Sequence, residues 1–177
     1  MQVNYTMIDS PQPVLPDFLC GVEVTHDYLL AEQVQITQLK TGYRVGSDAV
    51  LVAASLTAAR GRVLDLGAGV GGISLCIAMR LDEVQITAVE IDPVAAALAR
   101  HNVTINGINQ RVRVLNADIN AMPAVLAESF DHVISNPPYH HKAGTRPRHA
   151  ARAMAHMGAD TDLHDWVKAA VWATKRR

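Results

Sequence analysis

The sequence predicts an α/β fold in which a parallel sheet of about four strands has helices on both faces and a β-hairpin before it. Two observations lead to this fold class. Short apolar runs alternate with helical segments along the chain, as in parallel sheets with two buried faces. Glycines or acidic residues follow several of these runs, as expected where the carboxyl edge of such a sheet meets a ligand.

The N-terminal segment, residues 1–32, is expected to be an extended arm. Pro11, Pro13 and Pro16 lie within it, and each removes a backbone donor that regular structure would use. A single domain is then expected over residues 33–177, a length that is sufficient to bury a core.

The domain is expected to open with a hairpin over residues 34–46. Apolar and polar residues alternate in its first half, and a glycine-containing turn is predicted at 40–42. The apolar stretch 47–59 follows and indicates a helix, with Ser47 or Asp48 as its N-cap.

Four more strands then alternate with helices. The strands are expected at 62–67, 84–92, 111–118 and 130–135, and the helices at 71–81, 93–106 and about 161–174. Asp92 can cap the second of these helices, with Pro93 at its first position, and Asn106 and Gly107 form a C-terminal signal. The residues expected on the buried face of the last helix are Trp166, Ala170 and Val171.

The composition is that of an ordinary globular protein, with 49% apolar residues and a net charge of −1. The chain is not basic overall, so any nucleic-acid role would rest on a local patch. Cys20 and Cys76 lie far apart, which favours reduced thiols and a cytoplasmic protein. No signal peptide or membrane span is expected, and the spacing of the histidines predicts no metal site.

A glycine-rich loop follows the first buried strand. Gly67, Gly69, Gly71 and Gly72 allow a sharp turn and a close approach of the backbone to a ligand. Gly67, Gly69 and Gly72 match the dinucleotide pattern G-x-G-x-x-G. The spacing Gly67-x-Gly69-x-Gly71, with Asp65 two residues earlier, instead resembles motif I of S-adenosylmethionine-dependent methyltransferases. A structural strand-to-helix turn is the third interpretation.

Acidic residues end the next two strands. Glu90 can accept both hydroxyls of a ribose, a group that NAD and S-adenosylmethionine share. Asp118 could accept a hydrogen bond from an adenine amine, or it could cap a turn. These two residues therefore indicate a nucleoside but do not choose between the two cofactors.

The sequence Asn136-Pro137-Pro138-Tyr139 follows the fourth strand. A nucleobase amine or an amide nitrogen is a poor nucleophile, because its lone pair is delocalised. The Asn136 side-chain oxygen and the Pro137 carbonyl can accept its two N–H groups, and the prolines make these acceptors rigid. Tyr139 can stack on a planar target. A dehydrogenase has no use for this arrangement, whereas a proline turn with a packed tyrosine is the structural alternative.

With these motifs in place, the chain resembles the class I amino-methyltransferases, which carry N/D-P-P-Y/F/W after their fourth strand. "GYRVGSDAVLVAA", "VLDLGAGVGG", "NPPYH" and "AHMGADTDLHDW" are similar, more narrowly, to bacterial enzymes that methylate an adenine beside the anticodon of valine tRNA. The resemblance runs from about residue 33 to the C-terminus. It implies a Rossmann-like sheet and S-adenosyl-L-methionine as the cofactor.

The resemblance also implies site residues. Those expected to act on the substrate are Asn136, Pro137, Pro138 and Tyr139. Those expected to hold the cofactor are Arg44, Asp48, Asp65, Gly67, Ala68, Gly69, Glu90, Ile91, Asp118 and Asn136. Arg44 and Asp48 could equally be a structural pair at the start of a helix.

The substrate is expected to be tRNA. The segment 140–156 holds Lys142, Arg146, Arg148 and Arg152 and no acid, so it could contact phosphates. Methylation of a glutamine in a protein is the main enzymatic alternative.

In the family that the chain resembles, the sheet has seven strands, and this chain ends where the fifth strand would begin. We therefore expect three strands to be absent, the fourth to be an edge that could self-associate, and an inactive, cofactor-binding fragment as a further alternative.

Overall fold

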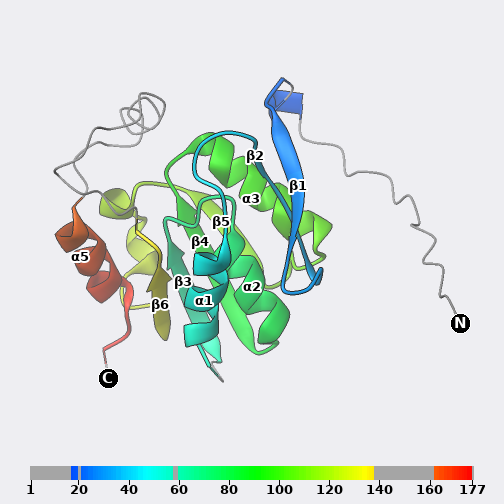
Figure 1. Ribbon diagram of the computed structural model, residues 1–177. Helices are drawn as coiled ribbons and strands as arrows, with labels where there is room; N and C mark the ends of the chain where they lie inside the picture. The colour runs from blue at the N-terminus through cyan, green and yellow to red at the C-terminus, as the bar shows by residue number, and fades with distance from the viewer. Residues whose placement is uncertain (1–16, 20, 58–59, 138–161, 177) are drawn as a thin grey trace, which may run out of the picture.

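The computed structural model describes residues 17–19, 21–57, 60–137 and 162–176. A parallel sheet lies at its centre, in the order β5-β4-β3-β6 (Figure 1). Its strands are β3 (Gly61–Leu66), β4 (Val84–Glu90), β5 (Val112–Asn116) and β6 (His132–Ser135). The predicted fold class, a parallel sheet with helices on both faces and an N-terminal hairpin, is confirmed.

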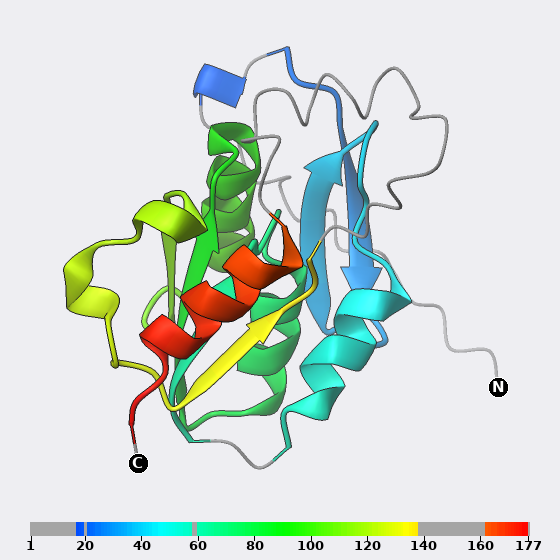
Figure 2. The same ribbon diagram turned by 90° about the vertical axis from the view of Figure 1, so that its left-hand side faces the viewer.

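The helices divide between the two faces of the sheet (Figures 1 and 2). On one face lie α1 (Ser47–Ser55), α2 (Gly72–Arg80) and α3 (Pro93–Ile105). On the other face lies α5 (Leu163–Ala173), together with 3₁₀ turns at Ile119–Ala121 and Ala124–Leu126. None of the helices in this part of the chain combines the length and the apolar character that crossing a membrane requires.

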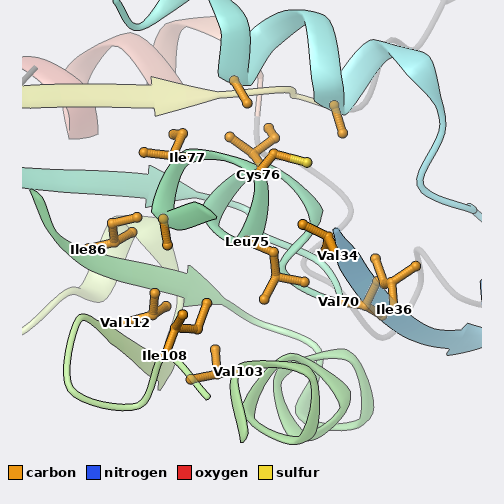
Figure 3. Packing of buried hydrophobic residues seen from close by; sticks show 14 of the residues in the cluster. Val34, Ile36, Val70, Leu75, Cys76, Ile77, Ile86, Val103, Ile108 and Val112 are labelled. Atoms are coloured by element: carbon orange, nitrogen blue, oxygen red, sulfur yellow. The ribbon is translucent and has the colours of Figure 1, made fainter. Parts of the chain in front are cut away.

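Alternation along β3 separates two apolar cores. Val63 points into the larger cluster and Leu64 into the smaller one, and both are fully buried. Figure 3 shows the larger cluster, in which Leu75, Cys76 and Ile77 of α2 meet side chains of the sheet, of α3 and of the hairpin. The sheet is therefore packed against an apolar cluster on each of its two faces.

The hairpin differs from the expectation. Strand β2 (Val34–Leu39) pairs antiparallel with β1 (Val24–Leu29), and the chain turns at residues 30–33. The chain bends at 40–42, where Gly42 has φ 100°, but it leads on to α1 and not to a second strand, so the prediction of a hairpin turn there is wrong. Alternation identified β2, but Val24–Leu29 precedes it, inside the segment expected to be an arm. The division of the chain at residue 33 stays a prediction, although β1 joins its two sides.

Helix ends agree with the local signals, with two exceptions, both in α1, which ends at Ser55 and not at residue 59. Asp92 caps α3 by accepting from the N–H groups of Val94 and Ala95, and Pro93 is its first residue. The N-cap of α1 is Gly46, so the predicted cap at Ser47 or Asp48 is wrong. The Asp48 carboxylate instead accepts hydrogen bonds from the side chains of Tyr43 and Asn136.

The last helix begins behind a capping box formed by Asp162 and Asp165. Its buried face carries Ala169 and Ala173, with Trp166 and Ala170 packed beside them. Val171 was expected on this face but is 71% exposed. It directly follows Ala170, and a turn of about 100° per residue moves it off the buried face.

Asn102 of α3 joins the hairpin to the glycine loop. Its side chain is fully buried, accepts from the Thr37 N–H at 2.7 Å, and donates to the carbonyls of Thr37 and Val70, both at 2.9 Å. Asn106, one turn later, makes the same pair of bonds to Gln35, but on the surface. The two asparagines thus offer a matched comparison of one contact in two environments.

Asn102→Ala is expected to lower the free energy of unfolding by about 2–4 kcal/mol, because it leaves buried backbone groups without partners. Asn106→Ala should cost about 1 kcal/mol or less, since water can replace its bonds to Gln35. Urea denaturation of both variants measures the difference. Equal losses would show that burial of the Asn102 contacts does not matter.

Candidate functional site

The carboxyl ends of the parallel strands bring the expected site residues to one edge of the sheet. Gly67 follows β3, Ile91 follows β4, and Asn136 follows β6. The Ser135 hydroxyl donates to the Leu66 carbonyl at 2.8 Å and ties the end of β6 to the start of the glycine loop. Residues far apart in the sequence therefore meet where such sheets bind ligands.

The glycine loop is held in a conformation that favours glycine. Gly67 has φ 65° and Gly69 has φ 57°, both in the left-handed region. A Cβ atom at Gly67 would overlap the Trp166 ring, whereas one at Gly69 would meet no atom within 4 Å. The loop also donates from the Ala68 N–H to the Val89 carbonyl at 3.0 Å. The Cβ direction at Gly67 is thus blocked by Trp166, while the Cβ direction at Gly69 is open.

Glu90 links the end of β4 to this loop. Its Oε2 accepts from the Gly69 N–H at 2.7 Å, and its Oε1 accepts from the Asp92 N–H at 2.8 Å. The residue is 5% exposed, and desolvation raises the pKa of the carboxyl while these backbone N–H groups lower it. Each oxygen has a second lone pair, so the carboxylate can accept a further hydrogen bond while it holds the loop.

Asp65 lies fully buried under the loop. Its Oδ2 accepts from the Ser74 hydroxyl at 2.7 Å, but its Oδ1 has no hydrogen-bond partner among the described residues. Desolvation raises the pKa of this carboxyl to about 7, against the opposing hydrogen bond from Ser74. A buried acceptor without a donor fits a site that receives a donor or a cation from a ligand.

The raised pKa of Asp65 predicts a pH-dependent stability. The folded protein keeps a proton that the unfolded chain, with a pKa of 3.8, has already lost. The contribution of Asp65 to stability therefore falls as pH rises from about 4 to about 7 and is level above that range. Asp65→Asn cannot ionise, so its free energy of unfolding relative to wild type should increase by a few kcal/mol, on the order of 2–4, across this window.

Urea denaturation of Asp65→Asn and wild type at several pH values tests this expectation. Asp82→Asn, at a side chain that is 96% exposed, is the matched control and should follow wild type. A difference between Asp65→Asn and wild type that does not change with pH would contradict the raised pKa.

The third strand end is arranged differently. Asp118 caps the 3₁₀ turn at Ile119–Ala121 by accepting from the Asn120 N–H at 2.8 Å. Its role toward a ligand stays a prediction. Asn116, which the sequence did not single out, donates to the carbonyls of Glu90 and Ile91 and thereby joins β5 to the end of β4. Asparagine at a strand end carries no distinctive sequence signal.

Arg44 and Asp48 do not pair with each other. Arg44 donates to Asp27 and to Thr25 of the hairpin, both at 2.8 Å. Asp48 accepts from the Tyr43 hydroxyl at 2.6 Å and from the Asn136 side-chain nitrogen at 2.8 Å. The alternative of an Arg44–Asp48 structural pair is therefore wrong, and contact of either residue with a cofactor stays a prediction.

Asn136 and Pro137 are the described part of the proline motif. The Asn136 nitrogen also donates to the Tyr43 hydroxyl at 3.2 Å, so three side chains meet at this point. Pro138 and Tyr139 lie outside the described residues, as does the basic segment 140–156. Tyr43 and Trp166 are two further site neighbours that sequence reasoning did not assign, although both lie in stretches that carried the family resemblance.

Comparison with protein families gives a match to the methyltransferase small domain over residues 42–163. A curated relative from Haemophilus influenzae, named tRNA1(Val) (adenine(37)-N6)-methyltransferase, is 31% identical over 147 residues, covering 82% of this chain and 61% of the relative. A relative of the same name from Shewanella baltica is 39% identical over 128 residues, covering 70% and 52%. The chain thus spans between about half and three fifths of the length of these relatives.

Solved structures share the fold. One from Agrobacterium tumefaciens, described as a predicted O-methyltransferase, aligns with a TM-score of 0.53 at 30% identity, over 72% of this chain and 56% of that one. A Pyrococcus horikoshii protein aligns with a TM-score of 0.61 at 19% identity, over 86% of this chain and 49% of that one. The second likeness concerns the fold alone.

Proposed function

We propose that this chain, which belongs to the methyltransferase small domain family, transfers a methyl group to an exocyclic amine of a nucleobase, adenine N6 in tRNA. The family is one of S-adenosylmethionine-dependent methyltransferases. The observation that carries the proposal is the position of Asn136 and Pro137, directly after β6 and beside the glycine loop that follows β3. Two acceptors for an amine therefore lie next to the cofactor loop.

The residues at this edge fit S-adenosylmethionine. The unpartnered Oδ1 of Asp65 suits a cationic or N–H donor group, and Glu90 retains lone pairs for the ribose hydroxyls. Open space beside Gly69 leaves room for a ligand against the backbone. When bound, the cofactor supplies an electrophilic methyl group on a sulfonium. Arg44, Ile91 and Asp118 are further proposed contacts.

Asn136 and Pro137 perform the orienting step. The side-chain oxygen of Asn136 and the Pro137 carbonyl accept the two N–H groups of the target amine and aim its lone pair at the methyl carbon. Rate then comes from orientation and from polar groups that are already in place. In the proposed arrangement, Tyr139 stacks on the extruded base. Pro138 helps to keep the acceptors before it rigid.

The tRNA substrate is proposed from the names of the relatives and from the basic residues of segment 140–156. Lysine and arginine side chains next to the proline motif would contact phosphates and place an RNA at the carboxyl edge. The same motif suits a glutamine amide, which makes a protein substrate the alternative outcome of the test.

The test begins with cofactor binding. S-adenosylhomocysteine at about 100 times its dissociation constant should stabilise the fold by roughly 2.7 kcal/mol. For a domain of this size, Tm should rise by roughly 5 to 10 °C, and NADH should give no shift. A shift with NADH alone would contradict the assignment of the glycine loop.

The second step measures methyl transfer. The chain is incubated with S-adenosylmethionine and tRNA that lacks the modification, and the digested nucleosides are analysed by mass spectrometry. N6-methyladenosine above the level of a heat-inactivated control supports the proposal. Labelling of a glutamine amide in a protein, without labelling of tRNA, would show that the substrate is the protein and not the nucleobase. Cofactor binding without any methylated product would overturn the proposed activity for this chain.

A further inference from the structure

Three side chains from distant parts of the chain converge at the end of β6. Tyr43 comes from the loop that follows the hairpin, Asp48 from the first turn of α1, and Asn136 from the proline motif. All three are joined by hydrogen bonds of 2.6 to 3.2 Å. The motif that grips the substrate is therefore itself held by residues outside it.

The chemistry of these groups allows only one orientation of the Asn136 amide. A carboxylate can only accept hydrogen bonds, and hydrogen bonding by Tyr43 lowers the pKa of Asp48, so it is ionised at neutral pH. The Tyr43 hydroxyl gives its one proton to Asp48, which leaves it as an acceptor toward Asn136. Both neighbours thus require the amide nitrogen, and a flipped amide would set its oxygen against a carboxylate.

We propose that Asp48 is a positioning residue that, together with Tyr43, holds the Asn136 amide with its oxygen toward the target amine. This inference rests on the proposed function. If the Asn136 amide nitrogen faced the target instead, its N–H groups would meet the N–H groups of the target amine, and no hydrogen bond could form. Asp48 therefore acts on the reaction through Asn136 and not through contact with the cofactor, which differs from the role expected from the family resemblance.

The loop that carries Tyr43 and Asp48 is fixed to the hairpin by polar contacts. Gln38 accepts from the Val45 N–H at 2.9 Å and donates to Asp27 at 2.9 Å, and Arg44 pairs with the same carboxylate. Val45 also packs closely on Gly72, at the start of α2. The hairpin, the glycine loop and the Asn136 amide are consequently parts of one connected arrangement.

The first experiment is a double-mutant cycle. Asp48→Ala should lower kcat by about 10- to 100-fold, because a misplaced amide loses orientation, while affinity for S-adenosylhomocysteine stays within about twofold. In the Asn136→Ala background, the same change should have almost no further effect, since the amide it positions is gone. If the two substitutions lowered kcat by factors that multiply in the double variant, the proposal would be overturned. Weaker binding of S-adenosylhomocysteine by Asp48→Ala would overturn it as well.

Conservative variants separate positioning from folding. Asp48→Asn keeps the shape and can offer an oxygen to Asn136, so it should regain part of the kcat that Asp48→Ala loses. Tyr43→Phe should reduce kcat by less than Asp48→Ala, and Tyr28→Phe, at a 57% exposed tyrosine of β1, is its matched control. A Tyr28→Phe loss equal to that of Tyr43→Phe would count against the arrangement.

A measurement independent of activity distinguishes failure of this inference from failure of the proposed function. The side-chain amide of Asn136, assigned in a ¹⁵N spectrum by its loss in Asn136→Ala, should have chemical shifts displaced by its bonds to the Asp48 carboxylate and the Tyr43 hydroxyl. In Asp48→Ala these shifts should move to those of an asparagine amide bonded to water. An unchanged signal overturns the inference even if methylation occurs. A changed signal in a protein that methylates nothing leaves the positioning intact and removes the proposed function.

Discussion

Replacing Asn136 with alanine is expected to lower methyl transfer by about 100- to 1,000-fold, comparable to the loss of one preorganised polar group from an active site. The variant keeps Pro137 but removes the side-chain oxygen that accepts from the target amine. It also leaves Asp48 and Tyr43 bonded to each other at 2.6 Å, so their carboxylate is not stranded. The fold should therefore survive the change.

The measurement is initial rate of methyl transfer together with affinity for S-adenosylhomocysteine. The affinity should change by less than about threefold, because the cofactor is expected to rest mainly on the loops after β3 and β4. Asn120→Ala, at an exposed position that contributes only its backbone N–H to Asp118, is the control for asparagine loss. Near wild-type turnover in Asn136→Ala would remove the basis for the proposed chemistry.

Gly67→Ala is expected to lower the free energy of unfolding by about 3–4 kcal/mol, the sum of backbone strain and a steric overlap. At φ 65° a Cβ atom is unfavourable, and here it would also overlap the Trp166 ring of α5. Trp166 is partly buried and packs against the smaller core cluster, which contains Ala169 and Ala173, so any shift of its ring disturbs this packing. The substitution should thus loosen α5 as well as the glycine loop.

Gly69→Ala provides the matched comparison. Its φ of 57° imposes a similar strain, but its Cβ atom would meet no protein atom within 4 Å. Its loss should be about 1–2 kcal/mol. Gly69→Ala is expected instead to weaken binding of S-adenosylhomocysteine, because the new methyl group occupies the open space beside the loop. Urea denaturation measures the loss of stability in both variants, and calorimetric titration measures their affinity for S-adenosylhomocysteine. Equal destabilisation of the two variants would contradict the role of Trp166.

The sheet and most helix ends could be predicted because their signals are local. Apolar runs, the cap at Asp92 followed by Pro93, and the stop at Asn106 depend on the conformational preferences of neighbouring residues. The same holds for the glycine loop, because backbone positions at positive φ favour glycine whatever the surrounding sequence. Parallel strands then place their carboxyl ends together, so Asp65, Glu90 and Asn136 could be assigned to one edge.

The sequence by itself therefore determined the fold class, the glycine loop after the first parallel strand and the edge where chemistry is proposed. Only the tertiary structure decided that β2 pairs with β1, that Arg44 bonds to Asp27, and that Asn136 bonds to Asp48 and Tyr43. The physical reason is that a local pattern restricts the backbone of its own segment. The partner of a polar side chain depends instead on which distant segments the folded core brings within hydrogen-bonding distance.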